Sequence, residues 1–392
     1  MNSRLQTPSI AVLLLITALA SASEAIIPES DDVILVRLPP STALTRPSSA
    51  VLHPILSEAM PTAREWVRVA RHEGDPRLLG RAQALLQPWW SGTDVPVDAL
   101  LLRAEIKQGL HAFEAALQDV DAALRREPRH GGAWLLKVTL HQVMGSYTNA
   151  QNACLQLARH ADALTATTAA ASLRSLWDSS SSPGQALATA IQQHSQAPGE
   201  VRAWAWTSLG EIHARNGEAV EAERSFQAAL ELQPKAPYTV TALADLWIAT
   251  GQFPRVADFL RDATSDPLRL RLAEALVRID PEAPATRSLV ASLADAFALG
   301  QIRGDDLHLR EFARFVLRIQ RQPALAVALA RKNWSIQREP ADLDLLFESA
   351  EAARDTETLA QANQWVEQYR LRVGWQTKTR GTHLQSSNTI VP

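Results

Sequence analysis

The stretch WAWTSLGEIHARNGEAVEAERSFQAALELQP, residues 204–234, decides the fold. In its first part, Trp206 and Leu209 are three residues apart, a spacing that places both side chains on one face of a helix. Gly217 then permits a tight turn, and Pro234 stops continuation of the second helix because proline lacks a backbone N–H. The stretch therefore predicts two antiparallel helices that are joined by a short turn.

The residues of this stretch strongly resemble the signature of the tetratricopeptide repeat (TPR), W-x2-L-G-x2-Y, A-x3-F, P, in which two helices form one unit of about 34 residues. The matching residues are Trp206, Leu209, Gly210, His213, Ala222, Phe226 and Pro234. His213 replaces the tyrosine of the signature, and Gly210 and Ala222 are small where the two helices approach each other. One pair of helices cannot bury its own apolar face, so neighbouring pairs must stack on it.

Neighbouring repeats follow the same spacing. The best repeats cover residues 97–130, 131–164, 203–236 and 237–270. Between them, residues 165–202 take 38 positions instead of 34, and the excess coincides with the serine-rich segment 178–184. We expect a degenerate repeat there, with a longer and flexible turn between its helices.

Weaker helical patterns extend the array in both directions. Residues 57–88 predict an irregular first pair, and the pattern beyond Leu270 stays helical to about residue 375. We therefore predict an all-α fold over residues 57–375, a right-handed α-solenoid of about nine TPR-like helix-turn-helix pairs that is degenerate at both ends. Atypical end repeats are expected because the terminal faces of a solenoid must be capped against water.

The N-terminus predicts export. Arg4 precedes the apolar run Ile10–Ala20, and small residues follow it, which is the order found in a secretory signal peptide (residues 1–25). Cleavage after Ala22 and cleavage after Ala25 both fit. The run is too short to span a membrane, which needs roughly 20 apolar residues. We expect a periplasmic protein, with secretion as the alternative.

The segments outside the solenoid differ from it in composition. Residues 26–56 are rich in proline and serine, and residues 376–392 form a polar tail, so we expect an extended segment and a disordered one. The single cysteine, Cys154, excludes an internal disulfide and falls at a predicted core position.

The charge balance of the chain argues against some classes of partner. The chain holds 39 basic and 42 acidic residues, a formal net charge of −3, with no run of lysine or arginine. This balance argues against nucleic acid or an anionic membrane surface as the main partner.

Several motifs outside the repeats are similar to a group of exported, periplasmic TPR proteins of proteobacteria. The motifs are DDV at 31–33, RLP at 37–39, GDPRLLG at 74–80, PWW at 88–90, LHLRE at 307–311, NW at 333–334 and QREP at 337–340. The serine insertion at 179–182 departs from that group. The resemblance implies the fold and the compartment, but no activity.

No pattern of residues predicts catalysis, a cofactor or a metal. The sequence contains neither HExxH nor G-x-S-x-G, the motifs of zinc peptidases and of many serine hydrolases. His141 and His213 occupy the tyrosine position of their repeats and are expected to pack. His308 follows Asp305 and Asp306; a functional site is one interpretation, and a helix cap formed by either aspartate is favoured.

A TPR solenoid usually binds a peptide in the concave groove that is lined by the first helix of each pair. The candidate groove residues are Glu105, Gln108, Leu135, Thr139, Gln142, Trp204, Thr207, Glu211, Tyr238, Thr241 and Asp245. Their acidic and aromatic character favours a basic or apolar peptide. The alternatives are a solvated helix face without a ligand, and docking of the apolar segment 33–39 in the groove.

The sequence thus favours a non-enzymatic, periplasmic TPR scaffold that binds a protein or peptide partner in this groove. One alternative is a component of an envelope assembly, polysaccharide export or secretion machine. Another is an unrecognised enzyme or small-molecule binder that uses residues 305–314. Of the two neighbouring tryptophans, we expect Trp206 to be structural and Trp204 to face the groove as an anchor.

Overall fold

The computed structural model describes residues 55–73, 75–92, 94–304 and 307–372. Within these ranges the regular elements are all helices. In chain order they are α1 (Leu56–Glu73), α2 (Pro76–Leu85), α3 (Gln87–Trp90), α4 (Val97–Gly109), α5 (Phe113–Arg126), α6 (Gly131–Val143), α7 (Tyr147–His160), α8 (Ala163–Arg174), α9 (Ser182–Gln193), α10 (Gly199–Asn216), α11 (Ala219–Leu232), α12 (Pro237–Ala249), α13 (Phe253–Phe259), α14 (Asp266–Ile279), α15 (Pro284–Ile302), α16 (Leu309–Arg318), α17 (Pro323–Ile336), α18 (Pro340–Ala353) and α19 (Thr356–Tyr369). The expected signal peptide and polar tail lie outside the described residues, as do nearly all of residues 26–56.

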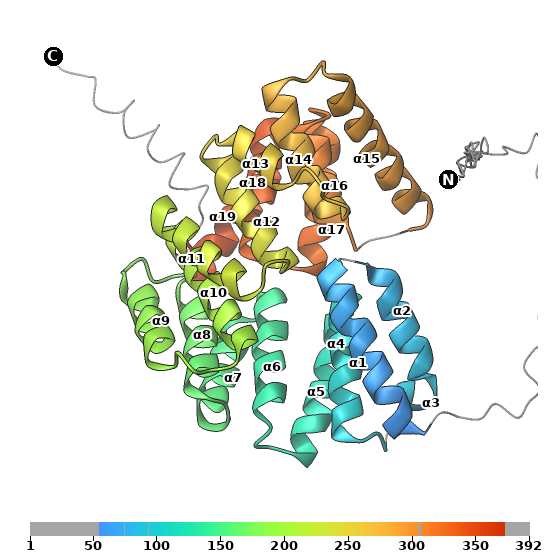
Figure 1. Ribbon diagram of the computed structural model, residues 1–392, viewed down its shortest axis with the longest axis vertical. Helices are drawn as coiled ribbons and strands as arrows, with labels where there is room; N and C mark the ends of the chain where they lie inside the picture. The colour runs from blue at the N-terminus through green and yellow to red at the C-terminus, as the bar shows by residue number, and fades with distance from the viewer. Residues whose placement is uncertain (1–54, 74, 93, 305–306, 373–392) are drawn as a thin grey trace, which may run out of the picture. The chain divides into compact units, whose positions relative to one another are not determined.

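Apart from the short α3, these helices form consecutive pairs, from α1 and α2 to α18 and α19 (Figure 1). Each pair also packs against the next along the chain, so that the apolar face of one pair is covered by its neighbour. The described part of the chain is therefore an all-α, right-handed solenoid of nine TPR-like pairs. The predicted fold class is confirmed.

The pair α10 and α11 shows how the local sequence produces this unit. Gly217 ends α10 with a φ of 80°, a left-handed conformation that glycine adopts without strain. Gly210 lies against Phe226 of α11, and a Cβ atom at this position would be 2.6 Å from the phenyl ring. Ala222 is completely buried in the same contact region. Small residues therefore set the close approach of the two helices.

Two turns differ in length from the regular pattern. Residues 175–181 separate α8 from α9, where only residues 110–112 separate α4 from α5. In the pair of α12 and α13, the second helix has only seven residues, and α14 already begins at Asp266. The early start of α14 has a local cause, because Pro267 at the first turn favours a new helix and disfavours continuation of an old one.

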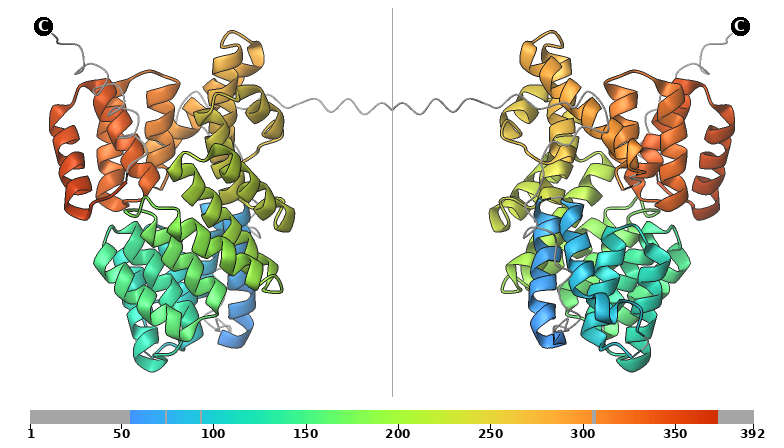
Figure 2. Two further views of the ribbon diagram at one scale, coloured as in Figure 1. Left: turned by 90° about the vertical axis from the view of Figure 1, so that its left-hand side faces the viewer. Right: turned by 90° about the vertical axis from the view of Figure 1, so that its right-hand side faces the viewer.

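The last pairs do not simply continue the array, because they also pack against its middle. The backbone N–H of Arg338 donates to the carbonyl of Val143 at 2.7 Å, and the N–H of Arg372 donates to the carbonyl of Leu176 at 2.6 Å. Seen from the side, the C-terminal helices lie next to the turns of the middle pairs (Figure 2). One hydrophobic cluster accordingly joins α7 and α8 with α14 to α19.

Five aromatic rings form the centre of this contact, which we call the aromatic cluster: Tyr147, Trp177, Trp334, Trp365 and Tyr369. The ring centroids of Trp365 and Tyr369 are 4.5 Å apart, and those of Tyr147 and Tyr369 are 5.2 Å apart. The guanidinium of Arg338 lies 4.6 Å from the ring centre of Trp365. Residues about 200 positions apart in sequence are thereby fixed to each other.

None of the described helices has the length and the apolar character that a crossing of the membrane requires.

Candidate functional site

The candidate groove residues lie on α4, α6, α10 and α12, the first helices of four pairs. They differ widely in exposure. Thr139 and Tyr238 are exposed, and Thr207 is buried. The half-buried ones are Glu105, Gln108, Leu135, Gln142, Trp204, Glu211, Thr241 and Asp245.

The prediction that Thr207 lines an open groove is wrong. Its side chain is only 4% exposed. The hydroxyl donates to the carbonyl of Ala203 at 2.9 Å and lies 2.8 Å from the hydroxyl of Thr239 on α12. Thr207 therefore links two neighbouring helix pairs of the solenoid. A hydroxyl group can donate one hydrogen bond and accept another, so it can serve a neighbouring hydroxyl inside a contact between helices.

Asp245, one of the acidic candidates whose character favoured a basic or apolar peptide, is already paired within the chain. Arg271 donates two hydrogen bonds to its carboxylate, at 3.1 and 3.0 Å, and Arg314 lies 2.7 Å from it. Burial disfavours the charged carboxylate, but the two guanidinium groups outweigh this effect and hold the pKa of Asp245 well below its usual range. The charge of Asp245 is thus already neutralised within the chain.

Asp245 is the first member of a chain of ion pairs that crosses four helices, α12, α14, α16 and α18. Arg314 pairs with Glu274 of α14 as well as with Asp245. Arg318 lies 3.2 Å from Glu274 and 2.6 Å from Glu348. Burial disfavours the charge on Glu274, but the arginines outweigh it and lower the pKa of that carboxyl. We call these residues, together with Arg271, the ion-pair ladder.

Glu211 and Tyr238 form a second unit on the neighbouring helices α10 and α12. The Tyr238 hydroxyl donates to the Glu211 carboxylate at 2.5 Å. The negative charge of Glu211 raises the pKa of Tyr238 well above its usual value, while burial raises the pKa of Glu211. The residue Tyr238 is nevertheless 62% exposed, so its position is fixed while much of its surface stays accessible.

Charged groups from the last helix pairs lie near Glu211 and Tyr238. Arg310 of α16 pairs with Glu339 and, at 2.5 Å, with Asp342. The charges of Arg310 and Glu339 also influence the pKa of Tyr238. Groups from α10, α12, α16 and the start of α18 therefore lie close enough to one another for their charges to interact. We call them the inner polar cluster: Glu211, Tyr238, Arg310, Glu339 and Asp342.

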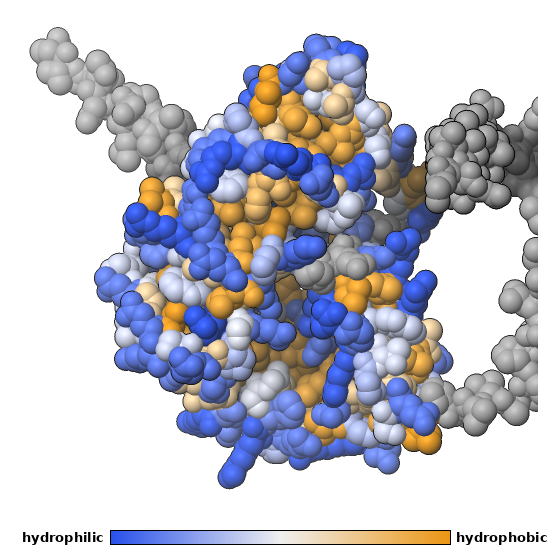
Figure 3. Space-filling model, in the orientation of Figure 1, coloured by the Kyte–Doolittle hydropathy of each residue, from blue (hydrophilic) through white to orange (hydrophobic). Residues whose placement is uncertain are grey.

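His111, in the turn between α4 and α5, is close enough to belong to the same surroundings. Burial lowers its pKa, and the positive charge of Arg310 lowers it further. In the space-filling view, the face that is shown is hollowed near its middle, and apolar residues are visible in the hollow (Figure 3).

Glu105, the remaining acidic candidate, is also paired, but weakly. Its carboxylate lies 3.1 Å from the guanidinium of Arg71, and 57% of the Arg71 side chain and 36% of the Glu105 side chain are accessible. Solvent screens such a pair, so its contribution to stability is small.

The two neighbouring tryptophans are more alike than expected. Both are half-buried. Trp206 packs against a cluster that includes Leu164 and Leu187, whereas Trp204 packs against a cluster of α6 to α8 that includes Val138 and Leu157. Part of the Trp204 surface therefore serves contacts within the solenoid, which the prediction of a free anchor did not include.

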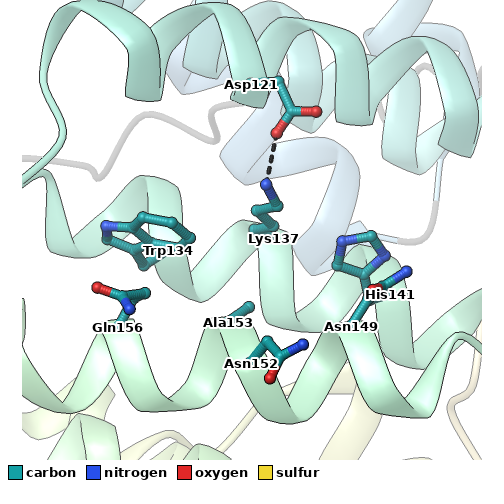
Figure 4. Close-up of a pocket in the computed structure, with 8 residues that line it drawn as sticks. All are labelled: Asp121, Trp134, Lys137, His141, Asn149, Asn152, Ala153 and Gln156. Atoms are coloured by element: carbon teal, nitrogen blue, oxygen red, sulfur yellow. Dashed lines mark hydrogen bonds and ion pairs between the residues drawn. The ribbon is translucent and has the colours of Figure 1, made fainter.

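A surface pocket of about 420 Å³ lies elsewhere, between α5, α6 and α7 (Figure 4). Its lining residues are Asp121, Trp134, Lys137, His141, Asn149, Asn152, Ala153 and Gln156. Lys137 lies 2.7 Å from Asp121 and 5.4 Å from the ring centre of Trp134. His141 is only 7% exposed, and its Nδ1 atom has no hydrogen-bond partner among the described residues.

The described residues contain no group of three or more histidine, cysteine or acidic side chains placed to hold a metal ion. Burial raises the pKa of the half-buried Cys154 thiol to about 11, so at neutral pH it is a thiol and not a nucleophilic thiolate. Asp305 and Asp306, the proposed neighbours of His308, lie outside the described residues.

Sequence reasoning did not identify the ion-pair ladder, although part of its signal was present. Arg314 and Arg318 of the ladder and Arg310 of the inner polar cluster recur every fourth residue and therefore share one face of α16. Their acidic partners are 29 to 69 positions away in sequence, and no local spacing indicates them.

No protein-family model matches this chain, and neither does any curated protein. Two solved structures resemble its helical arrangement. PilF of Pseudomonas aeruginosa is 16% identical with a TM-score of 0.39, over 53% of this chain and 95% of that one. A human IFIT1 dimer with PPP-AAAA is 13% identical with a TM-score of 0.44, over 80% of this chain and 78% of that one. Similarity at this level says nothing of this chain's own partner.

Proposed function

We propose that this protein is a non-enzymatic scaffold of the periplasm, which binds a segment of a protein partner on the concave, inner surface of its solenoid. The observation that carries the proposal is the geometry of Tyr238. Its hydroxyl is fixed by Glu211, and the residue stays 62% exposed. A preoriented aromatic side chain loses little conformational freedom on binding, and such side chains dominate the energetics of protein interfaces.

The same geometry favours an apolar, uncharged segment over a basic one. Asp245 is held by two arginines, Glu211 accepts from Tyr238, and Glu105 lies against Arg71. A basic peptide would have to displace these partners to gain an attraction of its own. The neutral side chains of Leu135 and Thr241 and the apolar residues in the hollow of Figure 3 suit an apolar segment better.

The periplasmic location rests on the N-terminal sequence. A basic residue, an apolar run and small residues follow one another in residues 1–25, as in an exported protein. Fractionation of cells that express the chain with and without residues 1–25 tests this part. We expect the protein to move from the periplasm to the cytoplasm when these residues are removed, and an unchanged distribution would contradict export by this segment.

Site-specific crosslinking tests the binding surface. We replace Tyr238 with a photoreactive phenylalanine, irradiate living cells, and identify the crosslinked products by mass spectrometry. The control position is Val220, which is 58% exposed but lies on α11, the second helix of its pair. The proposal predicts a dominant protein adduct at Tyr238 that is missing at Val220. The same adduct at both positions, or none at Tyr238, would refute it.

A further inference from the structure

The pocket between α5, α6 and α7 has a row of amide side chains on one wall. Asn149, Asn152 and Gln156 project from α7 toward α6 (Figure 4). Their spacing of three and four residues places them along one face of the helix. No hydrogen bond is made by these three side chains to any other described residue. Their donors and acceptors are therefore available to a ligand.

The described residues that line the pocket leave no charge free to attract an ion. Among them the one cation, Lys137, lies 2.7 Å from the one carboxylate, that of Asp121. Burial lowers the pKa of His141, and the charge of Lys137 lowers it further, so the imidazole is neutral at neutral pH. An uncharged ligand fits this balance better than an anionic or a cationic one.

The aromatic ring of the pocket is not free for stacking. The ammonium group of Lys137 lies 5.4 Å from the ring centre of Trp134. The indole N–H of Trp134 already donates to the carbonyl of Pro128 at 2.8 Å. A sugar ring, which typically needs an open aromatic face, would have to displace Lys137 first. The recognition groups that remain are the three amides and the imidazole.

His141 supplies a second sign of a missing ligand. The residue is 93% buried, since 7% of it is exposed, and its Nδ1 atom has no partner among the described residues. A buried polar atom without a hydrogen bond is costly and rare in native proteins. The ring lines the end of the pocket near Asn149 (Figure 4), so a ligand that enters this end lies against it.

The length of the amide row matches an extended peptide. A helix rises about 1.5 Å per residue, so the seven steps from Asn149 to Gln156 span roughly 10 Å, about three residues of an extended chain. An amide side chain offers one acceptor and one donor group, as a peptide group does. We infer that this pocket binds the main chain of an extended, uncharged peptide segment through Asn149, Asn152, Gln156 and His141.

This site is distinct from the concave surface proposed above. On α6, the pocket residues Trp134, Lys137 and His141 are turned on average by roughly 130° around the helix axis from Leu135, Thr139 and Gln142, at about 100° per residue. The two surfaces therefore lie on different sides of α6. The volume of about 420 Å³ falls in the range of small ligand sites, roughly 300 to 1,000 Å³.

Fluorescence anisotropy with the purified full chain tests the inference. The probe is a fluorescein-labelled, capped octapeptide of serine, threonine, alanine and glutamine, compared with the same peptide N-methylated at alternate backbone amides. We expect the first to bind and the second to bind at least about tenfold more weakly, because methylation removes main-chain donors. The double variant Asn149→Ala/Asn152→Ala should also lose about tenfold in affinity.

Matched variants distinguish binding in this pocket from binding elsewhere on the chain. Gln151→Ala changes an exposed amide of the same helix outside the pocket, and Tyr238→Ala changes the concave surface; both should bind the peptide as the unchanged protein does. Circular dichroism confirms that each variant is folded. The inference is overturned if the unmethylated peptide does not bind, if methylation has no effect, or if the double variant binds normally. It is also overturned if maltotriose, used as a saccharide probe, displaces the peptide.

Discussion

Two polar regions of this solenoid differ in whether their side chains have partners within the chain. In the ion-pair ladder of α12 to α18, each charged group has a partner within the chain, and Arg271, Glu274 and Arg314 are buried. In the pocket of α5 to α7, the amides of Asn149 and Asn152 are exposed and have no partner among the described residues.

The difference shows which polar residues serve the fold and which are free to bind. A buried charge without a partner is costly, so the charges of the ladder depend on one another. The exposed amides of the pocket are solvated by water in the free protein and can exchange that water for a ligand at little cost. Polar side chains on a helix therefore do not indicate a binding surface until their hydrogen-bond and ion-pair partners within the chain are known.

The largest expected effect is that of removing one member of the ladder. Arg314→Met leaves Glu274 and Asp245 without their shared cation, and we expect a loss of about 3–5 kcal/mol in the free energy of unfolding. Urea denaturation measures it. As a control, Arg287→Met removes an exposed pair with Glu282 and should change stability by less than about 1 kcal/mol. Equal, small losses in both variants would show that the ladder does not stabilise the fold.

The second-largest effect is expected from acid, which should weaken the ion-pair ladder. The folded-state pKa values of Asp245 and Glu274 are lowered, so their contribution is complete above the ordinary values of 3.8 and 4.5 and is lost as the pH falls below them. We expect stability to decrease by about 2 kcal/mol between pH 5 and pH 3. Thermal unfolding as a function of pH measures this. Glu274→Gln should flatten the acid dependence, and a curve identical to that of the unchanged protein would contradict the assignment.

Thr207 and Thr139 provide a matched pair of smaller changes. Both hydroxyls donate to the carbonyl four residues earlier, but Thr207 is buried beside Thr239, and Thr139 is exposed. Thr207→Val should cost about 1–3 kcal/mol because the Thr239 hydroxyl loses its neighbour, whereas Thr139→Val should cost less than about 0.5 kcal/mol. Reversed costs, measured by chemical denaturation, would place Thr207 on an open surface after all.

The smallest effect on stability is expected in the pocket. Asn152 is exposed and makes no hydrogen bond to another described residue, so Asn152→Ala should change the free energy of unfolding no more than Gln151→Ala does, within about 0.5 kcal/mol. Differential scanning calorimetry of the two variants compares them. A clear loss in Asn152→Ala alone would assign this amide to the fold and weaken the contrast between the two regions.

The helix pairs could be predicted from the sequence because their determinants are local. Gly217 ends α10 in a left-handed conformation, and Gly210 lies against Phe226 across the same pair. These residues are separated by no more than 16 positions, and the spacing recurs along the chain. Periodicity and turn chemistry therefore identified the fold class without any long-range information.

The arrangement of the inner surface could not be predicted in the same way. The contacts of Tyr147 with Trp365, and of Arg338 with Val143, join residues about 200 positions apart. Nothing in a 34-residue period indicates that the last pairs return to the middle of the array. Asp245 likewise pairs with a residue that is far away in sequence, Arg314. No local spacing indicates that its charge is neutralised, so the sequence predicted an acidic groove.

The central claim is that the inner charges stabilise one another instead of forming an open acidic surface. A double-mutant cycle tests it most directly, with Arg314→Met, Glu274→Leu and the combined variant compared by urea denaturation. We predict that the combined variant is less destabilised than the sum of the two single changes by at least about 1 kcal/mol, because removing both charges leaves neither one unpaired. Losses that add within about 0.5 kcal/mol would contradict the claim.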